Sequence, residues 1–353
     1  MNETRTDRCP LCGADNACAM ARAGGDPAAC EGCWCRDATI PESLIARVPG
    51  AARGRACICA RCVSMEAATP APGVRFTVDP GGRPAIELTH GRNRALIARL
   101  GAQVLSWSGP DGDALWTASG AAYDDGAPVR GGVPVVFPWF GDHAEDASKP
   151  AHGFARGREW TVVATSASSV TLAVRDDEQT RTLWPHEFSV ELEVTLRDTL
   201  QVTMRVDNPS AENFTFEQAL HTYFAVGDIQ TASVRGLEGV PCTEHARAPE
   251  AGWDPAVPLR FRAETDRVFQ GAPAAITLDA PALGREVTLT APAARSAIVW
   301  NPWPVKAATL SQMAPDDWQA FCCVETANCK ENAVTLAPGQ RHQLTLTLRR
   351  AQR

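Results

Sequence analysis

Most of the chain alternates between apolar and polar residues, which is the period of half-buried β-strands. The clearest case is a pair of alternating runs, 190–196 and 200–206, separated by Arg197-Asp198-Thr199, and this arrangement predicts a β-hairpin. Similar runs occur at 95–107, 170–174, 275–278, 287–289 and 342–348, with almost no long stretch of helical period. The pattern therefore predicts one large all-β sandwich over residues 75–353.

The cysteines mark a second, smaller unit at the N-terminal end. Nine of the thirteen cysteines lie between Cys9 and Cys62. A stretch containing Pro70, Pro72 and Gly73 follows, without hydrophobic periodicity, as expected of an extended connector. We expect a cysteine-rich module over residues 1–63, a linker over 64–74, and the β-sandwich from residue 75 onward.

The spacing of these cysteines favours metal binding. Cys9 and Cys12, like Cys59 and Cys62, are separated by two residues, the gap that presents two thiolates to one tetrahedral zinc ion. Nine thiols match two closed zinc sites with one thiol left over, although a binuclear cluster sharing ligands, or a set of disulfides, also fits the count. The expected ligands are Cys9, Cys12, Cys30, Cys33, Cys35, Cys57, Cys59 and Cys62.

Composition excludes several classes of protein. No apolar run reaches the roughly 18 residues of a membrane-spanning helix, and the first residues are polar, unlike a signal peptide. We therefore expect a cytoplasmic protein with no membrane partner. The formal net charge of −7 argues against nucleic-acid binding over the whole surface. Residues 1–62 hold eight Lys or Arg and seven Asp or Glu, a net of 8 − 7 = +1, so the module has no basic patch either.

Two ionisable residues stand in otherwise apolar surroundings. His221 lies within the apolar and aromatic segment 216–224, and an imidazole there is either a satisfied core histidine or a proton donor and acceptor. Glu325 follows the apolar residues 321–324, which predicts a position at the end of a buried strand. A buried carboxylate must be paired or functional, since an uncompensated charge in the interior costs several kcal/mol.

Further candidates lie in segments dense in glycine and proline or in charge. Arg130 opens the segment 129–141, whose glycines and prolines predict a shaped loop, while His152 and Arg156 lie in the segment 150–156. Each arginine suits a carboxylate or a phosphate, or is an ordinary surface residue. Asp266 lies in the acidic segment 261–269, which is otherwise expected to be a solvated turn.

The order of these motifs resembles a known family. The body carries RGGVPVVFPWFG, AHGFAR, FEQALHTYF, GLEG, ETD, WNPW, CVE and LAPG in sequence, and so resembles the hexose-6-phosphate mutarotases, also called glucose-6-phosphate 1-epimerases, a branch of the galactose-mutarotase-like superfamily. The first 62 residues, with CPLCG and the triplet Cys33-Trp34-Cys35, resemble the cysteine-rich CWC family.

The resemblance implies a fold and a chemistry. It implies a galactose-mutarotase-like β-sandwich that interconverts the α and β anomers of a hexose 6-phosphate, without a cofactor for catalysis. His221 would be the catalytic acid and Glu325 the base, with Asp266, Arg130, Arg156 and His152 binding the sugar phosphate. The alternatives are a 1-epimerase of unphosphorylated aldoses and a non-catalytic carbohydrate-binding protein. The zinc module would be structural, and its partner stays open.

Overall fold

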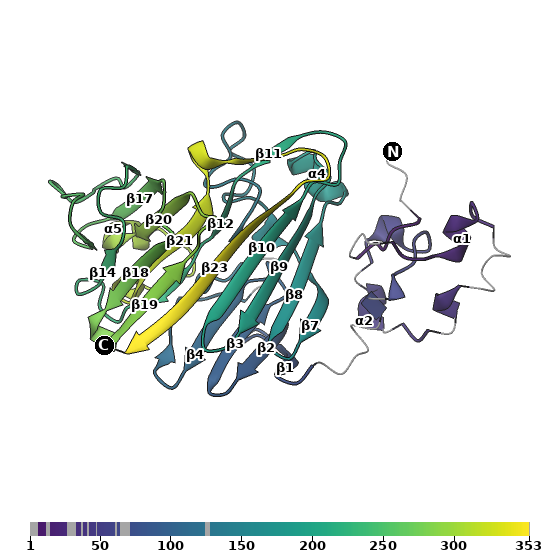
Figure 1. Ribbon diagram of the computed structural model, residues 1–353, viewed down its shortest axis with the longest axis horizontal. Coiled ribbons are helices and arrows are strands. Elements are labelled where there is room, and N and C mark those ends of the chain that lie inside the picture. Colours follow the sequence, from purple (N-terminus) through teal and green to yellow (C-terminus); the bar gives the residue numbers. More distant parts are fainter. Residues whose placement is uncertain are drawn as a thin grey trace.

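The body of the protein is built from antiparallel β-sheets, as the hydrophobic pattern predicts. The computed structural model describes residues 6–11, 15–26, 33–36, 38–40, 42–46, 48–60, 62–63, 71–123 and 128–352 (Figure 1). The first strand of the body begins at Val74, where the linker was expected to end. Of the predicted linker, residues 64–70 lie outside the described residues.

Two sheets dominate the body, and two smaller ones complete it. The largest sheet has nine strands in the order β16 (Leu259–Arg260), β14 (Ser233–Arg235), β18 (Ala275–Ala280), β19 (Arg285–Thr290), β23 (Arg341–Gln352), β10 (Leu200–Asp207), β9 (Ser189–Leu196), β8 (Ser169–Arg175) and β7 (Thr161–Ser166). The second has seven, β15 (Cys242–Glu244), β17 (Thr265–Gln270), β20 (Ser296–Asn301), β21 (Phe321–Asn328), β12 (Gln218–Leu220) and β6 (Val135–Val136), with β13 (Tyr223–Ala225) also on β21.

The remaining strands form smaller sheets at the margins. The five-stranded sheet runs through β1 (Val74–Val78), β2 (Pro84–His90), β3 (Asn93–Ala98), β4 (Val104–Gly109) and β5 (Gly112–Asp113). β11 (Phe214–Phe216) and β22 (Val334–Leu336) form a two-stranded sheet. The apolar run 95–107 is therefore two strands, β3 and β4, joined by a turn at Gly101 and Ala102, whose φ angles are 70° and 48°.

The strand periodicity produces one main core. The predicted hairpin is confirmed as β9 and β10, in which Leu200 is paired with Leu196 and Val202 with Val194. Their alternate apolar residues are buried, together with those of β8 and β23, in one cluster that also contains residues of β2, β3 and β4. Burying alternate residues from facing sheets is the packing of a β-sandwich.

Helices are short and peripheral. Those that lie wholly within the described residues are α1 (Ala19–Arg22), α2 (Glu42–Ala46), α4 (Glu178–Leu183) and α5 (Trp303–Ala307), with the 3₁₀ turns η2 (Trp34–Arg36), η3 (Gly50–Ala52), η4 (Ala155–Gly157), η5 (Pro281–Leu283), η6 (Asp317–Gln319) and η7 (Lys330–Asn332). The Asp177 side chain caps α4 by accepting from the Thr180 N–H at 2.8 Å. Among the described residues, no helix is long and apolar enough to cross a membrane.

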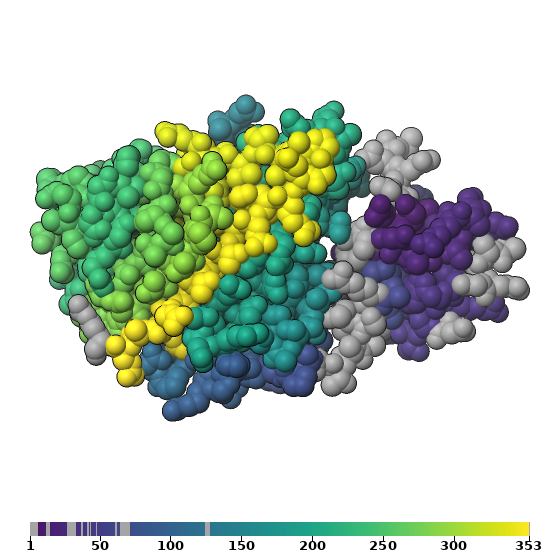
Figure 2. Space-filling view, viewed as in Figure 1, coloured from purple at the N-terminus to yellow at the C-terminus, as the bar shows by residue number. Residues whose placement is uncertain are grey.

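The cysteine-rich module packs against one edge of the large sheet. Figure 1 shows α1 and α2 on the side of the body nearest β7, and Figure 2 shows the module as a separate lobe on that side. Cys9, Leu44 and Cys62 share a buried apolar cluster with Val163 of β7 and Ala173 of β8. The Thr161 hydroxyl also donates to the Leu11 carbonyl at 3.4 Å. The module thus covers part of an edge strand, a position where an open strand invites unwanted pairing.

Candidate active site

The register of the seven-stranded sheet places several polar side chains on one face. Asp266 on β17 is opposite Trp300 on β20, and Trp300 is opposite Cys323 on β21. Residues directly opposite one another share a face, and so does the residue two positions further along a strand. Glu325 therefore lies on the same face as Asp266 and Trp300. The alternative in which Asp266 belongs to a solvated turn is excluded, because Asp266 lies within strand β17.

The candidate base lies deeper than its sequence context indicates. Glu325 was expected at the end of a strand, but it is an interior residue of β21, all of whose residues are buried, and its side chain is 2% exposed. His221 lies in the short break between β12 and β13, where its backbone N–H donates to the Pro134 carbonyl at 3.0 Å. This break turns the imidazole toward β21.

The two candidate proton-transfer groups are in contact. Nε2 of His221 lies 3.3 Å from Oε1 of Glu325. Within the described part of the chain, the outer atoms of the pair, Nδ1 of His221 and Oε2 of Glu325, are buried without a hydrogen-bond partner. Buried polar atoms in native structures nearly always have partners, so these two mark a place where a polar ligand completes the site.

Burial sets the protonation of both groups. It raises the pKa of Glu325 well above its ordinary value, and the charge of Asp266 raises it further. Burial also lowers the pKa of His221 well below its ordinary value, and His152 and Arg156 lower it further. Both shifts favour the uncharged forms, a neutral imidazole beside a protonated carboxyl group, while the charge of Arg156 acts on the pKa of Glu325 in the opposite direction. The pair then holds one proton that either group can carry.

Two glycine-containing loops bring the candidate binding residues to this face. A side chain at Gly132 would place its Cβ 2.1 Å from the Val104 carbonyl oxygen, and at Gly153 its Cβ would lie 2.0 Å from the Phe137 carbonyl oxygen. Only glycine allows these close approaches, which hold the loop of Arg130 and the loop of Arg156 against the body. Both loops are irregular, as the sequence predicts, with only the short strand β6 and the turn η4 between them.

The binding candidates converge on the buried pair. The imidazole ring of His152 is 5.5 Å from that of His221, edge to face. Burial lowers the pKa of His152 to about 3, and the charges of Arg156, Lys330 and Arg130 act in the same direction. His152 is therefore neutral, and its Nδ1 accepts from the Gly141 N–H at 3.3 Å. The structure thus brings together all six predicted residues of the body.

The two arginines bring positive charge close to the buried pair, and the charge of Arg156 lowers the pKa of Glu325. Arg130 Nε donates to the Ser311 carbonyl at 2.8 Å, and Arg156 donates to the Ala151 carbonyl at 2.6 Å. Among the described residues, neither arginine forms an ion pair with a carboxylate. Both guanidinium groups keep further N–H donors, so this face of the sheet is suited to an anion such as a phosphate.

Tyr223 and Lys306 complete the site although no argument from their own chemistry identified them, whereas the tryptophans beside Asn301 are expected either in the core or as a floor for a sugar ring. Tyr223 stacks on His221 with ring centroids 4.9 Å apart, and Trp300 meets the same imidazole edge to face at 6.2 Å. Lys306 on α5 lies 3.3 Å from Asp266 and 3.4 Å from Glu264. These aromatic faces can pack on a sugar ring, and Lys306 holds Asp266 in place.

Glu217 joins two of the loops. Its carboxylate accepts from the Phe140 N–H at 2.7 Å and from the Lys330 N–H at 2.5 Å. Lys330 has a φ angle of 56°, and its Nζ donates to the Phe140 carbonyl at 3.5 Å. The motif FEQALHTYF contains Glu217, but only the folded chain shows that this carboxylate ties together the segments of Phe140 and Lys330, and Phe140 contacts the ring of His152.

The cysteine-rich module contains a separate group of three sulfur ligands. The sulfur atoms of Cys9, Cys59 and Cys62 all lie within 4.8 Å of one another and are buried, which is close enough to hold one metal ion. Cys33, Cys35 and Cys57 do not join this group; their thiols contact one another and that of Cys18, which was absent from the expected ligands. The expected ligands Cys12 and Cys30 lie outside the described residues.

The fold and the face just described define a mutarotase-like β-sandwich with an added cysteine-rich module. Residues 84–349 match the family described as Aldose 1-epimerase, and residues 9–64 match the family described as Cysteine-rich CWC. The chain therefore belongs to the aldose 1-epimerase family, with a cysteine-rich CWC segment at its N-terminal end. The two resemblances expected from the motifs are confirmed.

Similar proteins agree with this assignment. A protein of Escherichia coli (strain K12) named "Putative glucose-6-phosphate 1-epimerase" is 32% identical over 252 residues, covering 70% of this chain and 83% of that protein. A protein of Cenchrus ciliaris with the same name is 31% identical, covering 77% and 86%. The crystal structure of a "putative mutarotase" from Salmonella typhimurium has a TM-score of 0.68 and 28% identity, covering 76% of this chain and 91% of that one.

Proposed function

We propose that the protein interconverts the α and β anomers of a hexose 6-phosphate, with Glu325 as general base and His221 as general acid. The observation that carries the reaction is the buried contact between these groups, each with a polar atom left for substrate. The observation that supports a phosphate group is that Arg130 and Arg156 form no ion pair with a carboxylate of the described residues. The names of the E. coli and Cenchrus ciliaris relatives support the same substrate.

The reaction requires one proton to leave the sugar and one to arrive. Glu325 as a carboxylate takes the proton of the C1 hydroxyl, and His221 as an imidazolium gives a proton to the ring oxygen. The C1–O5 bond breaks, and C1 becomes the aldehyde carbon of the open chain. Rotation about C1–C2 and the reverse proton transfers close the ring on the other face. Each positioned group typically contributes about 10²- to 10⁴-fold.

A single proton transfer within the pair converts its resting protonation state into the reactive state. Moving the shared proton from Glu325 to His221 across their 3.3 Å contact produces the carboxylate and the imidazolium together. No proton is exchanged with solvent in this step. The pair is therefore competent while it holds one proton, and it is inactive when it holds two or none.

Each remaining residue has a place in binding. We assign Arg130 and Arg156 to the phosphate, and His152 and Asp266 to hydroxyl groups of the sugar. Lys306 holds the Asp266 carboxylate at 3.3 Å, so this carboxylate is fixed before the sugar arrives. A preorganised acceptor of this kind improves binding because less freedom is lost when the ligand enters.

The test compares the rates at which the protein interconverts the anomers of glucose and of glucose 6-phosphate. We expect a much larger kcat/KM with the phosphorylated sugar. Equal values for the two sugars would reject the phosphate assignment in favour of an epimerase of free aldoses. If neither sugar reacted faster than in buffer alone, the protein would be a binding protein and not an enzyme.

We also propose that the ion of the cysteine-rich module is zinc and that it is structural. The buried thiols of Cys9, Cys59 and Cys62 suit zinc, and the Cys9-x-x-Cys12 spacing supplies the fourth ligand. A closed site of four thiolates leaves no position for substrate, so the ion would stabilise the module. Metal analysis of the protein purified under reducing conditions should find zinc; its absence would contradict this assignment.

A further inference from the structure

A second group of thiols lies elsewhere in the cysteine-rich module. The Cys33 and Cys35 sulfur atoms are 3.2 Å apart, and those of Cys18 and Cys57 are 3.4 Å apart. Cys33 also contacts Cys18, and Cys35 contacts Cys57. The four sulfur atoms therefore form a closed ring of contacts, although they come from three separate segments of the chain.

These separations of 3.2 and 3.4 Å are far longer than a disulfide bond and somewhat shorter than the spacing of neighbouring zinc ligands. A disulfide joins sulfur atoms at about 2.05 Å, and all four residues are free cysteines. In a tetrahedral site with Zn–S bonds of about 2.3 Å, neighbouring sulfur atoms lie about 3.8 Å apart. Among the described residues, no three of these four sulfur atoms all lie within 4.8 Å of one another, so the ring is flatter and more open than a tetrahedron. Rotation about the Cα–Cβ bonds would close it around an ion.

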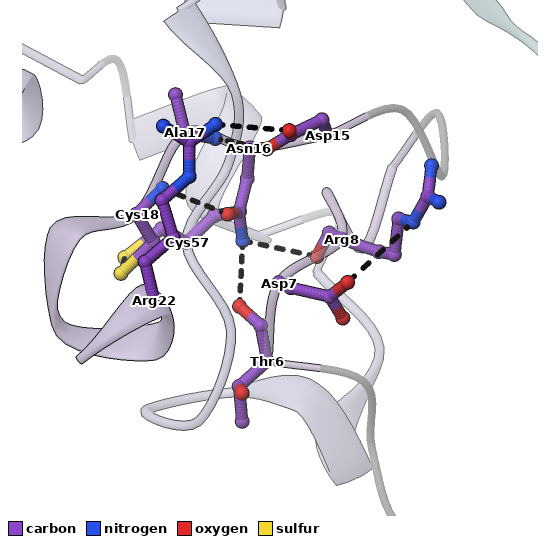
Figure 3. Close-up of polar contacts among 9 residues, drawn as sticks. All are labelled: Thr6, Asp7, Arg8, Asp15, Asn16, Ala17, Cys18, Arg22 and Cys57. Atoms are coloured by element: carbon purple, nitrogen blue, oxygen red, sulfur yellow. Dashed lines mark hydrogen bonds and ion pairs between the residues drawn. The ribbon is translucent and has the colours of Figure 1, made fainter. Parts of the chain in front are cut away.

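A buried asparagine holds two of these cysteines in position. The Asn16 side-chain oxygen accepts from the Cys18 N–H at 3.0 Å, and its amide nitrogen donates to the Cys57 carbonyl at 3.1 Å. The same nitrogen donates to the carbonyls of Thr6 and Arg8, and Asn16 is 0% exposed (Figure 3). One side chain thus fixes the backbone of two ligand-bearing segments, as residues around structural metal sites do.

Trp34, between Cys33 and Cys35, connects the segment of these two cysteines to Asn16. Its indole N–H donates to the Asn16 carbonyl at 3.0 Å. The backbone N–H groups of Ala19 and Cys35 donate to the Cys33 sulfur. Backbone donors of this kind stabilise a thiolate, which is the form that binds a metal.

We propose that Cys18, Cys33, Cys35 and Cys57 form a second four-thiolate zinc site, distinct from the site of Cys9, Cys59 and Cys62. In this assignment Cys18 is a ligand and Cys30 is not. The module then contains two mononuclear ions with one cysteine to spare, and not a binuclear cluster or a disulfide framework. The inference does not depend on the reaction proposed for the body.

The first test is the zinc content of the full chain, purified under reducing conditions. We expect two zinc ions per chain in the wild-type protein and one after Cys18→Ser. Cys30→Ser is the matched control, because it removes a thiol of the same module, and it should leave two ions. Two ions in the Cys18→Ser protein, or one in the Cys30→Ser protein, would overturn the assignment.

A second measurement on the wild-type chain decides the question even if Cys18→Ser fails to fold. The thiols are alkylated before and after zinc is removed by a chelator, and the modified residues are located by mass spectrometry. Cys18, Cys33, Cys35 and Cys57 should react together and only after chelation. A Cys18 that reacts while zinc stays bound, or a disulfide linking Cys33 to Cys35 or Cys18 to Cys57, would overturn the proposal.

Discussion

Nε2 of His221 lies 3.3 Å from Oε1 of Glu325, in a buried contact between a strand break and a strand interior. Burial lowers the pKa of the imidazole and raises that of the carboxyl group, so one shared proton is retained over a range of pH. Activity through this pair should be lost when a second proton binds and when the last one leaves.

The first prediction is a bell-shaped dependence of kcat/KM on pH. The acidic limb should lie below the ordinary histidine value of 6.5, because the pKa of His221 is lowered, and the basic limb should lie above the ordinary value of 4.5, because the pKa of Glu325 is raised. Asp266→Asn removes a negative charge that raises the pKa of Glu325, so its basic limb should move to lower pH.

The measurement compares the pH profiles of the wild type and Asp266→Asn with the same sugar phosphate, so that titration of the substrate phosphate affects both equally. Glu331→Gln, an exposed substitution away from the pair, is the control and should keep the wild-type profile. A basic limb that stays in place after Asp266→Asn would show that this carboxylate does not act on Glu325.

Glu325→Gln should remove activity and stabilise the fold. The variant keeps the size of the side chain but cannot accept the proton of the C1 hydroxyl, so we expect a loss of about 10²- to 10⁴-fold in kcat. A carboxyl group whose pKa is raised by folding contributes stability that is present below the unfolded value of 4.5 and is lost as the pH rises toward the folded pKa. Glutamine has no such loss.

The excess in Tm of Glu325→Gln over the wild type should therefore grow as the pH increases above 4.5. Thermal unfolding followed at several pH values measures this difference. A variant that is inactive but no more stable than the wild type at high pH would mean that Glu325 is paired or hydrated in solution, and not buried beside a neutral imidazole.

The strands of this site follow from their own residues, but their alignment does not. Alternating apolar residues are sufficient to predict the β9–β10 hairpin and most of the body. The position of Glu325 was misjudged because β21 is buried on both faces, and a fully buried strand carries no alternation to locate its end. A solvated turn was an open alternative for the segment of Asp266, because its acidic residues interrupt the apolar alternation of a strand; in the structure Lys306 lies beside the carboxylates of Glu264 and Asp266.

The grouping of the cysteines could not be derived from spacing either. The two-residue gap correctly indicates that the sulfur atoms of Cys59 and Cys62 lie close together. Cys18 has no cysteine within several residues, so spacing offers no signal for it. The assignment of Cys18 to the second zinc site depends on the folded chain, in which Asn16 joins the segments of Cys18 and Cys57 through hydrogen bonds.

Asn16→Ala should weaken zinc binding at the second site without removing a ligand. Losing the bonds that fix Cys18 and Cys57 should reduce the affinity of one ion about 10- to 100-fold, as is typical for residues that orient metal ligands. Competition with a chromophoric chelator measures this loss. Arg22→Ala, which breaks an exposed ion pair with Asp15 nearby (Figure 3), is the control and should leave both affinities unchanged.

Arg156→Ala should separate the phosphorylated from the free sugar. Losing a charge-assisted contact to phosphate costs about 1.5 to 3 kcal/mol, a decrease of roughly 10- to 150-fold in kcat/KM for glucose 6-phosphate. Glucose should be affected much less. Arg158→Ala removes an arginine two residues away that is paired with Asp177, and it should change the two substrates equally. An equal loss for both sugars in Arg156→Ala would mean that Arg156 only supports its loop through Ala151.

The final prediction concerns removal of the cysteine-rich module. A chain beginning at Ala67 should keep the activity of the full protein, because all six residues assigned to the site lie in the body.

The tendency of the shortened chain to aggregate should change, however. Val163 and Ala173, which are 4% and 3% exposed, would lose their apolar cover at the edge of the large sheet. We therefore expect the shortened chain to aggregate more readily, and Val163→Thr, which keeps a β-branched side chain but adds a hydroxyl, to reduce this aggregation. Anomerisation rate and light scattering, measured on the full chain, the shortened chain and its Val163→Thr variant, test both parts. Loss of activity in a shortened chain that is still folded would mean that the module belongs to the catalytic unit, and unchanged aggregation would mean that the apolar contact with β7 and β8 is not what the module protects.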